Sequence, residues 1–164
     1  MQYSNPWKRL AAFLIDAIII SIPASIFMVI LMTVMMNSNQ ELINQFQYAV
    51  QTNTEPSPEM IKGFVSAFLQ LQLYYMAAYS LMWWLYNALL ESSKWQATLG
   101  KKMLGMIVVD AEGQKISFLR ASGRWLGKYI SQTLWPVLFA IFFTEKKQAL
   151  HDMPVKTFVI DEVK

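Results

Sequence analysis

Asp16 is a carboxylate inside a long apolar stretch from Leu10 to Met36, and Arg9 stands at the beginning of that stretch. An ionised carboxylate near the middle of a membrane helix costs about 2.5 to 3.5 kcal/mol on insertion scales. A chain that keeps such a group usually has a partner for it or a use for it, such as the binding of a proton or a small cation. We therefore treat Asp16 as the first candidate functional residue.

The spacing of Arg9 and Asp16 decides how the two charges can interact. They are seven positions apart, so in a helix they share a face but are separated by two turns, about 10 Å along the axis. Direct pairing within the helix is therefore unfavourable, and we expect Asp16 to find a partner in another segment. Two plainer alternatives stay open: Arg9 only anchors the helix at the cytoplasmic face, and Asp16 makes a structural polar contact.

Pro23 is a second chemical feature of the same stretch. It removes a hydrogen bond from the carbonyl of Ile19, one turn beyond Asp16, and Ser21 can help to satisfy the local backbone. Freed carbonyls beside a carboxylate are hard oxygen ligands of the kind that bind small cations. The sequence thus permits a cation site supported by Ile19, Ser21 and Pro23, although an ordinary proline kink is the simpler interpretation.

The composition places these residues in a membrane protein. Hydrophobic residues make up 55% of the 164 positions and charged residues 15%, and a soluble chain of this length cannot bury so much apolar surface. The first apolar stretch is long enough to cross a hydrocarbon layer of about 30 Å and lacks the pattern of a cleaved signal peptide. We expect a single membrane domain over residues 1–164.

The sequence offers little for metal, cofactor or nucleic-acid chemistry. No Cys and a single His exclude disulfides, thiolate sites and clusters of imidazole ligands. The net charge of +3 is small and scattered, which argues against nucleic acid as a partner. No nucleophile occurs in a recognised catalytic setting, so we expect neither an enzyme nor a bound cofactor.

Charge placement predicts the topology. A second apolar segment covers residues 64–90, and the polar segment before it, residues 37–58, has acidic residues but no basic ones. Basic residues precede the first span and follow the second, so the positive-inside rule puts the N-terminus and the loop 91–124 in the cytoplasm. The predicted fold class is an all-α membrane protein with transmembrane helices at about 10–36 and 64–90.

The third apolar segment, residues 125–143, admits two interpretations. A single crossing would carry Lys146 and Lys147 outside, against the charge rule that orients the rest of the chain. Pro136 breaks the hydrogen-bond ladder of a helix. We therefore favour a re-entrant helical hairpin that bends near Pro136, with a third full crossing as the alternative. In the hairpin interpretation the tail, residues 144–164, is cytoplasmic.

The cytoplasmic loop predicts a small β-hairpin followed by a helix. Residues 107–109 lead through a turn to residues 114–116, and Gly113 supplies the positive φ that the turn requires. Ser117 is an N-cap for the helix that follows. Residues 157–160 are β-branched and aromatic, so they could add a strand to the hairpin.

Three sequence elements follow one another in order. They are Arg9 and Asp16 in the first span, the stretch 97–110, and a segment that ends at His151 and Asp152. Together they resemble the RDD family of small bacterial membrane proteins, which is named for one Arg and two Asp that map onto Arg9, Asp16 and Asp152. The resemblance adds His151 to the candidate cluster. The family usually has a small Ala-Gly pair after the second Asp, which this chain lacks.

The resemblance implies a location and a function. Arg9 and Asp152 would pair at the cytoplasmic face and balance the charge of Asp16, which lies deeper and binds a proton or a small cation. The protein would be a multi-pass protein of the bacterial cytoplasmic (inner) membrane. It would carry out ion-coupled transport such as cation/proton exchange, as a homo-oligomer or with a membrane protein partner. The alternative is a non-catalytic membrane scaffold or accessory protein with a structural Arg/Asp cluster.

Overall fold

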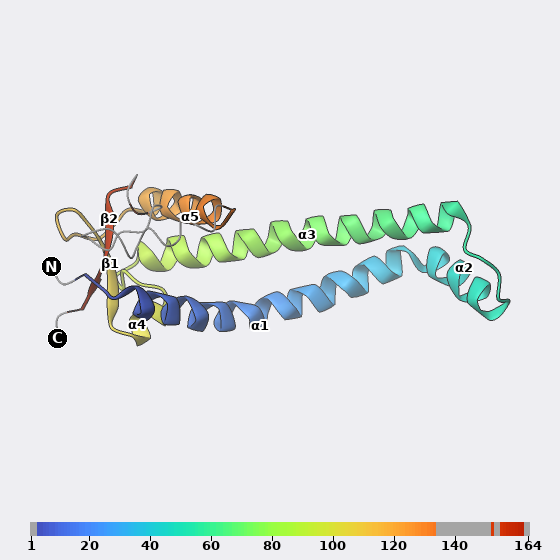
Figure 1. The fold of residues 1–164 in the computed structure, drawn as a ribbon, viewed down its shortest axis with the longest axis horizontal. Helices are drawn as coiled ribbons and strands as arrows, with labels where there is room; N and C mark the ends of the chain where they lie inside the picture. Colours follow the sequence, from blue (N-terminus) through green and yellow to red (C-terminus); the bar gives the residue numbers. More distant parts are fainter. Residues whose placement is uncertain (1–2, 134–151, 153–154, 163–164) are drawn as a thin grey trace. The chain divides into compact units, whose positions relative to one another are not determined.

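The structure is a computed structural model that describes residues 3–133, 152 and 155–162 (Figure 1). The fold is mostly helical, as predicted. In chain order its elements are α1 (Pro6–Ser38), α2 (Gln40–Gln51), α3 (Pro58–Glu91), α4 (Leu99–Met103), β1 (Met106–Asp110), α5 (Phe118–Thr133) and β2 (Thr157–Asp161). The chain forms two compact units, unit 1 from residues 1–20 and 82–164 and unit 2 from residues 21–81. The long helices α1 and α3 contribute residues to both.

Unit 1 contains the sheet. β1 and β2 pair antiparallel over the five residues of each strand. The segment before α1 joins the other edge of β2, because the Ser4 N–H donates to the Val159 carbonyl at 3.1 Å. The predicted strand at residues 114–116 is wrong, since this segment contributes only an isolated bridge between Val109 and Lys115. The strand that pairs with β1 therefore comes from a distant segment of the chain and not from a local hairpin.

The distant strand was the optional part of the prediction, and it is confirmed. Residues 157–160 lie within β2 and replace the hairpin strand as the partner of β1. The turn after β1 still forms, because the Asp110 N–H donates to the Gln114 carbonyl at 3.0 Å and Gly113 has φ +78°. Gln114 is polar and exposed, whereas β2 is β-branched and aromatic and buries Val159. Such residues pack better on a pleated surface.

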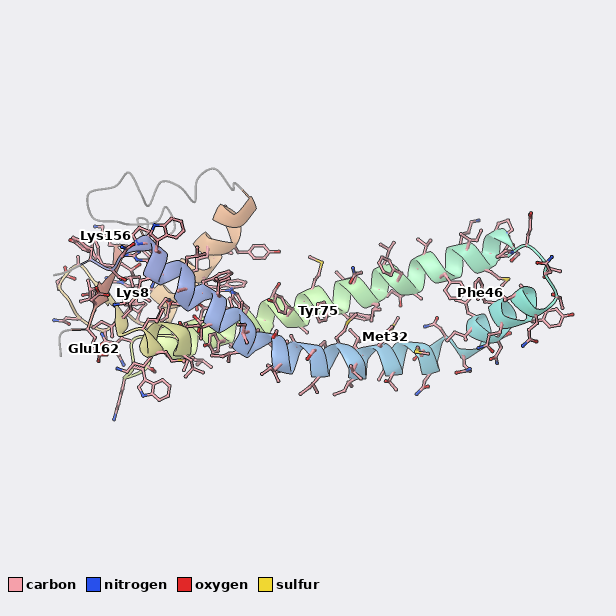
Figure 2. The ribbon with its side chains drawn as sticks, turned by 60° about the horizontal axis from the view of Figure 1, so that its bottom comes forward. Lys8, Met32, Phe46, Tyr75, Lys156 and Glu162 are labelled. Atoms are coloured by element: carbon pink, nitrogen blue, oxygen red, sulfur yellow. The ribbon has the colours of Figure 1, made fainter. Side chains whose placement is uncertain are left out.

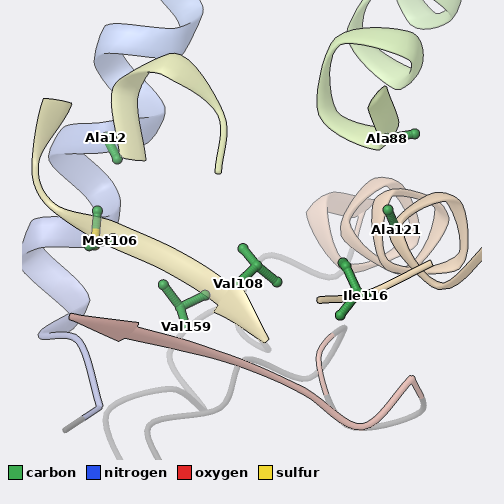
Figure 3. Close-up of a cluster of buried hydrophobic side chains, with 7 residues drawn as sticks. All are labelled: Ala12, Ala88, Met106, Val108, Ile116, Ala121 and Val159. Carbon is green, nitrogen blue, oxygen red and sulfur yellow. The ribbon is translucent and has the colours of Figure 1, made fainter. Parts of the chain in front are cut away.

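A small apolar core holds unit 1 together (Figure 3). Its buried members are Ala12, Ala88, Met106, Val108, Ile116, Ala121 and Val159. The helices α1, α3 and α5 each contribute an alanine, whose small side chain lets the helix backbone approach its neighbours closely. Trp84 of α3 packs against this core and donates its indole N–H to Ser122 Oγ of α5 at 3.0 Å.

The helix α5 begins where the sequence predicts. Ser117 is its N-cap, because Ser117 Oγ accepts from the Arg120 N–H at 3.3 Å and its carbonyl accepts from the Ala121 N–H at 2.9 Å. The predicted third membrane segment, 125–143, begins inside α5. Pro136 and the rest of that segment lie outside the described residues, so the choice between a re-entrant hairpin and a crossing stays a prediction.

Unit 2 contains a helix that hydropathy alone did not indicate. The connection 37–58, expected only as a polar loop, includes α2. Its Gln, Glu, Leu and Ala residues are good helix formers, which explains the helix. Ala49 of α2 is buried, and Phe46 meets Phe64 of α3 edge to face, with ring centroids 5.1 Å apart. Side chains stand out around α2 and along the neighbouring parts of α1 and α3 (Figure 2).

Among the described residues, α1 is the one helix both long and apolar enough to cross a membrane by length and composition. It runs for 33 residues through the predicted span 10–36 and contains Pro23. Only 11% of its most apolar window is buried within the structure, whereas the core helix of a soluble protein would be mostly buried. The second predicted span, 64–90, lies within the 34 residues of α3, and its passage through the membrane stays a prediction.

Candidate functional site

Asp16 is 5% exposed and accepts hydrogen bonds from three uncharged groups. Its Oδ1 accepts from the Gly100 backbone N–H at 2.7 Å and from the Tyr86 hydroxyl at 2.6 Å. Its Oδ2 accepts from the Thr98 hydroxyl at 2.6 Å. These donors come from α3 and from the start of α4. The expected partner in another segment is therefore present, and it is a set of neutral donors.

These contacts make Asp16 a cap for α4 that comes from another helix. Thr98 occupies the N-cap position of α4, but its side chain makes no cap hydrogen bond and donates to Asp16. Asp16 accepts the Gly100 N–H in its place, and the Leu99 N–H donates to the Tyr86 hydroxyl oxygen at 3.2 Å. The first N–H groups of a helix have no partner inside it. In α4 the N–H groups of Leu99 and Gly100 are satisfied by side chains of α3 and α1.

Gly100 is a point of close approach between α4 and α1. A Cβ atom at this position would lie 2.2 Å from the Ala12 carbonyl oxygen and 2.9 Å from Asp16 Oδ1. Real side chains do not tolerate such distances to backbone, so the approach requires glycine. The middle stretch of the family resemblance, 97–110, thereby becomes part of the Asp16 site.

Arg9 and Asp152 form the predicted pair, with Arg9 Nη1 3.4 Å from Asp152 Oδ2. Arg9 Nη2 also donates to the Val159 carbonyl of β2 at 3.0 Å. Asp152 is fully buried, and its Oδ1 accepts from Arg124 Nε at 2.7 Å. The Asp16 carboxylate itself contacts neutral donors, and the expectation that Arg9 and Asp152 balance its charge stays a prediction. Arg9 connects the start of α1 to Asp152, which precedes β2 in the sequence. Asp152 in turn pairs with Arg124 of α5.

Glu91, the last residue of α3, is the centre of a buried network that the sequence analysis missed. Its Oε1 accepts from the ammonium groups of Lys101 and Lys128, the latter at 3.3 Å, and its Oε2 accepts from Arg124 Nη1 at 3.3 Å. Arg124 also contacts Asp152, so it links the two networks. A signal was available: Glu91 follows the second apolar segment directly, and Arg124 and Lys128 are four positions apart.

Two buried cations that contact Glu91, Lys101 and Arg124, differ in how firmly they keep their protons. Burial lowers the pKa of Lys101 from 10.5 to about 7, against the pull of Glu91, and Lys128 and Arg124 add to the lowering. Burial also disfavours the charge of Arg124, but Asp152 and Glu91 together raise its pKa above the usual value. Arg124 therefore keeps its charge firmly, whereas Lys101 is the cation that the network holds least favourably.

The residues predicted to support an ion site differ from Asp16 in their exposure. Ser21 and Pro23 are exposed and Ile19 is half-buried, while Asp16 is buried. Their role at an ion site stays a prediction. Among the described residues, no group of His, Cys, Asp or Glu side chains is placed to hold a metal ion. His151, the remaining member of the predicted cluster, lies outside the described residues.

Comparisons with known proteins extend the resemblance over most of the chain. The RDD family matches residues 3–156. Among curated proteins, the chain is similar to "Uncharacterized protein YxaI" from Bacillus subtilis (strain 168), with 34% identity over 156 residues that cover 94% of each chain. No solved structure matches the chain. The family match includes Arg9, Asp16 and Asp152, so the capping contact and the ion pairs described above all involve residues inside it.

Proposed function

The chain belongs to the RDD family. From the contacts of its Arg and Asp residues we propose that it is a non-catalytic membrane scaffold or accessory protein in which these residues hold distant segments together. Its location is the bacterial cytoplasmic membrane, with the N-terminus in the cytoplasm. α1 and α3 are its two spans, and α5 begins the third membrane segment. The basic residues before the first span and after the second support this orientation.

One observation carries the proposal: both oxygens of Asp16 are occupied by donors of the chain itself. A carboxylate that binds a transported cation has to offer open oxygen atoms. Gly100, Thr98 and Tyr86 take up three of the roughly four acceptor positions of the carboxylate. Arg9 and Asp152 are likewise engaged in ion pairs with partners far away in the sequence. The three family residues thus act here as fastenings.

A second candidate, cation/proton exchange, is favoured by a separate observation. Glu91 and Lys101 form a buried ion pair at the end of α3, and ionisable groups buried in membrane proteins often serve proton movement. Two spans and a third short segment can hardly enclose a route through the bilayer. This function therefore requires a homo-oligomer or a membrane protein partner, with a proton and a small cation as the exchanged species.

The variant Asp16→Asn separates the two candidates. An amide has one acceptor oxygen, so it leaves part of the donor set of α4 unsatisfied, which costs about 1 to 3 kcal/mol for a buried group. We expect a lower melting temperature in detergent and a lower abundance in membranes. The matched control is Asp161→Asn, which removes a partly exposed ion pair with Lys8 in the same unit and should have little effect.

Flux measurements complete the test. The scaffold function predicts that proteoliposomes show no cation-dependent proton movement that depends on Asp16. A folded Asp16→Asn protein with an unchanged melting temperature and abolished flux would establish transport instead. If the variant changed neither stability nor flux, Asp16 would have neither role.

A further inference from the structure

Positive charges outnumber negative ones in the buried network around Glu91. Its described members are two carboxylates and four cations, so the network carries an excess of two positive charges when all are ionised. They are Glu91 and Asp152 on the one side, and Arg9, Lys101, Arg124 and Lys128 on the other. A buried charge without a counter-charge is expensive, so an excess of this kind favours an anion.

The two lysines of this network have donors to spare. An ammonium group has three N–H donors. Within the described part of the chain, Lys101 donates to Glu91 alone, and Lys128 donates to Asn87 Oδ1 at 3.1 Å and to Glu91. Both ammonium groups reach the same oxygen, Glu91 Oε1, so they are close neighbours. The Lys128 side chain is 22% exposed and the Lys101 side chain 10%, so Lys128 is the end of the pair that is reachable from outside.

The lowered pKa of Lys101 indicates that its positive charge lacks sufficient counter-charge. Its pKa falls to about 7 because of burial and because Lys128 and Arg124 lie nearby, despite the contact with Glu91. Two changes could relieve this unfavourable charge: Lys101 can lose its proton, or an anion can bind beside the two lysines. An anion would also use the spare N–H donors, which proton loss would leave partly unfilled.

The surface of α5 beside Lys128 carries aromatic side chains. Trp125 and Tyr129 lie three positions before and one position after Lys128, and Tyr129 is 50% exposed. Trp125 and Tyr129 stack with ring centroids 5.7 Å apart, and such rings favour the headgroup level of a bilayer. A basic pair beside an apolar, aromatic surface fits a molecule with an anionic head and hydrocarbon tails.

We propose that Lys101 and Lys128 bind a phosphate group, which the headgroup of an anionic phospholipid supplies at the cytoplasmic surface of the membrane. The phosphate oxygens accept the spare N–H groups of both lysines and offset the excess positive charge of the network. The acyl chains lie along the rings of Trp125 and Tyr129 on α5. The inference is independent of whether the protein is a scaffold or a transporter.

The test uses the full-length protein in nanodiscs of phosphatidylcholine, with or without phosphatidylglycerol. We expect phosphatidylglycerol to raise the melting temperature and to be retained by the folded protein in native mass spectrometry. Lys128→Gln should weaken this retention about fivefold, the effect of one basic residue near an anionic surface. Lys128→Arg keeps the charge and should retain most of the binding.

The matched control is Lys102→Gln. Lys102 neighbours Lys101 in α4, but its ammonium group pairs with Glu162 and its side chain is 40% exposed. Its substitution should leave phosphatidylglycerol retention unchanged. Retention is counted on the folded fraction, so a loss of folding is not mistaken for a loss of binding. Equal retention of the two lipids by the unmodified protein, or equal losses in Lys102→Gln and Lys128→Gln, would overturn the proposal.

A second arm distinguishes the source of the phosphate. Inorganic phosphate is added to the protein in phosphatidylcholine nanodiscs at constant ionic strength. If it stabilises the protein and Lys128→Gln abolishes the effect, the site takes phosphate from solution. If only phosphatidylglycerol stabilises, the headgroup is the source. If neither stabilises, the lysines do not form a phosphate site.

Discussion

The two units of this chain bury different kinds of residues. In the described part of the chain, all buried polar and charged residues belong to unit 1, and they include Asp16, Glu91, Arg124 and Asp152. The buried apolar residues of unit 2 are two alanines, Ala24 and Ala49. Unit 1 thus has the interior of a small folded domain, with a sheet, a core and ion pairs. Unit 2 consists of helices whose larger apolar side chains stand outward.

This difference shows which forces each unit relies on. Outward-facing apolar side chains lose nothing in hydrocarbon, so the helices of unit 2 need few contacts with one another when lipid surrounds them. The charged side chains of unit 1 are buried away from water, so they need partners of opposite charge. We therefore expect single substitutions to cost far more in unit 1 than in unit 2.

The largest effect is expected for Glu91→Gln. This change leaves the charges of Lys101, Lys128 and Arg124 buried together without their shared carboxylate. Removing one partner of a buried pair costs about 3 to 5 kcal/mol, which thermal unfolding in detergent would show. Glu59→Gln, at the exposed first turn of α3 in unit 2, is the control and should cost less than about 1 kcal/mol. Similar losses for the two variants would remove the contrast between the units.

A glycine pair sharpens the comparison. Gly100→Ala places a Cβ 2.2 Å from backbone in unit 1, whereas Gly63→Ala in unit 2 meets only the flexible Leu42 side chain, at 3.1 Å. We expect Gly100→Ala to destabilise by about 1 to 3 kcal/mol through overpacking. Gly63→Ala should be neutral or stabilising by up to about 1 kcal/mol, because alanine favours the helix. The melting temperatures of both variants are compared with that of the unmodified protein. An unchanged melting temperature of Gly100→Ala would contradict the close approach of α4 and α1.

The pH dependence of stability tests the charge of unit 1. The folded protein releases the Lys101 proton near pH 7, while the unfolded chain keeps it up to about pH 10.5. Between these values the unfolded state binds more protons, so stability should rise with pH. The rise is measured as the melting temperature in phosphatidylcholine nanodiscs, and Lys101→Met should flatten it. A melting temperature that falls equally in both proteins would contradict the lowered pKa.

The smallest effect is expected in unit 2, for Phe46→Ala. Phe46 is 39% exposed and contributes an edge-to-face contact with Phe64. Such contacts contribute about 0.5 to 1.5 kcal/mol, so the unfolding free energy should fall by no more than that. Hydrogen exchange of α2 would localise the loss. A loss as large as that of Glu91→Gln would mean that unit 2 has a core of its own.

Much of the fold follows from patterns within a few residues. The apolar stretch of α1, the N-cap at Ser117 and the positive φ of Gly113 depend on local properties of the chain, and all three are confirmed. The prediction of a strand at 114–116 was wrong because two segments, 114–116 and β2, compete to pair with β1. Strand pairing depends on which segment packs best, and a nearby turn does not decide that.

The candidate site divides in the same way. The sequence by itself determined that Asp16 needs a partner and, through the family resemblance, that Arg9 and Asp152 pair. Only the tertiary structure decided that Asp16 caps α4 through Gly100, and that Glu91 gathers its cations from two other helices. Hydropathy and propensity are properties of neighbouring residues, whereas a hydrogen bond or a buried ion pair exists only when folding brings distant atoms within about 3 Å at the right angle.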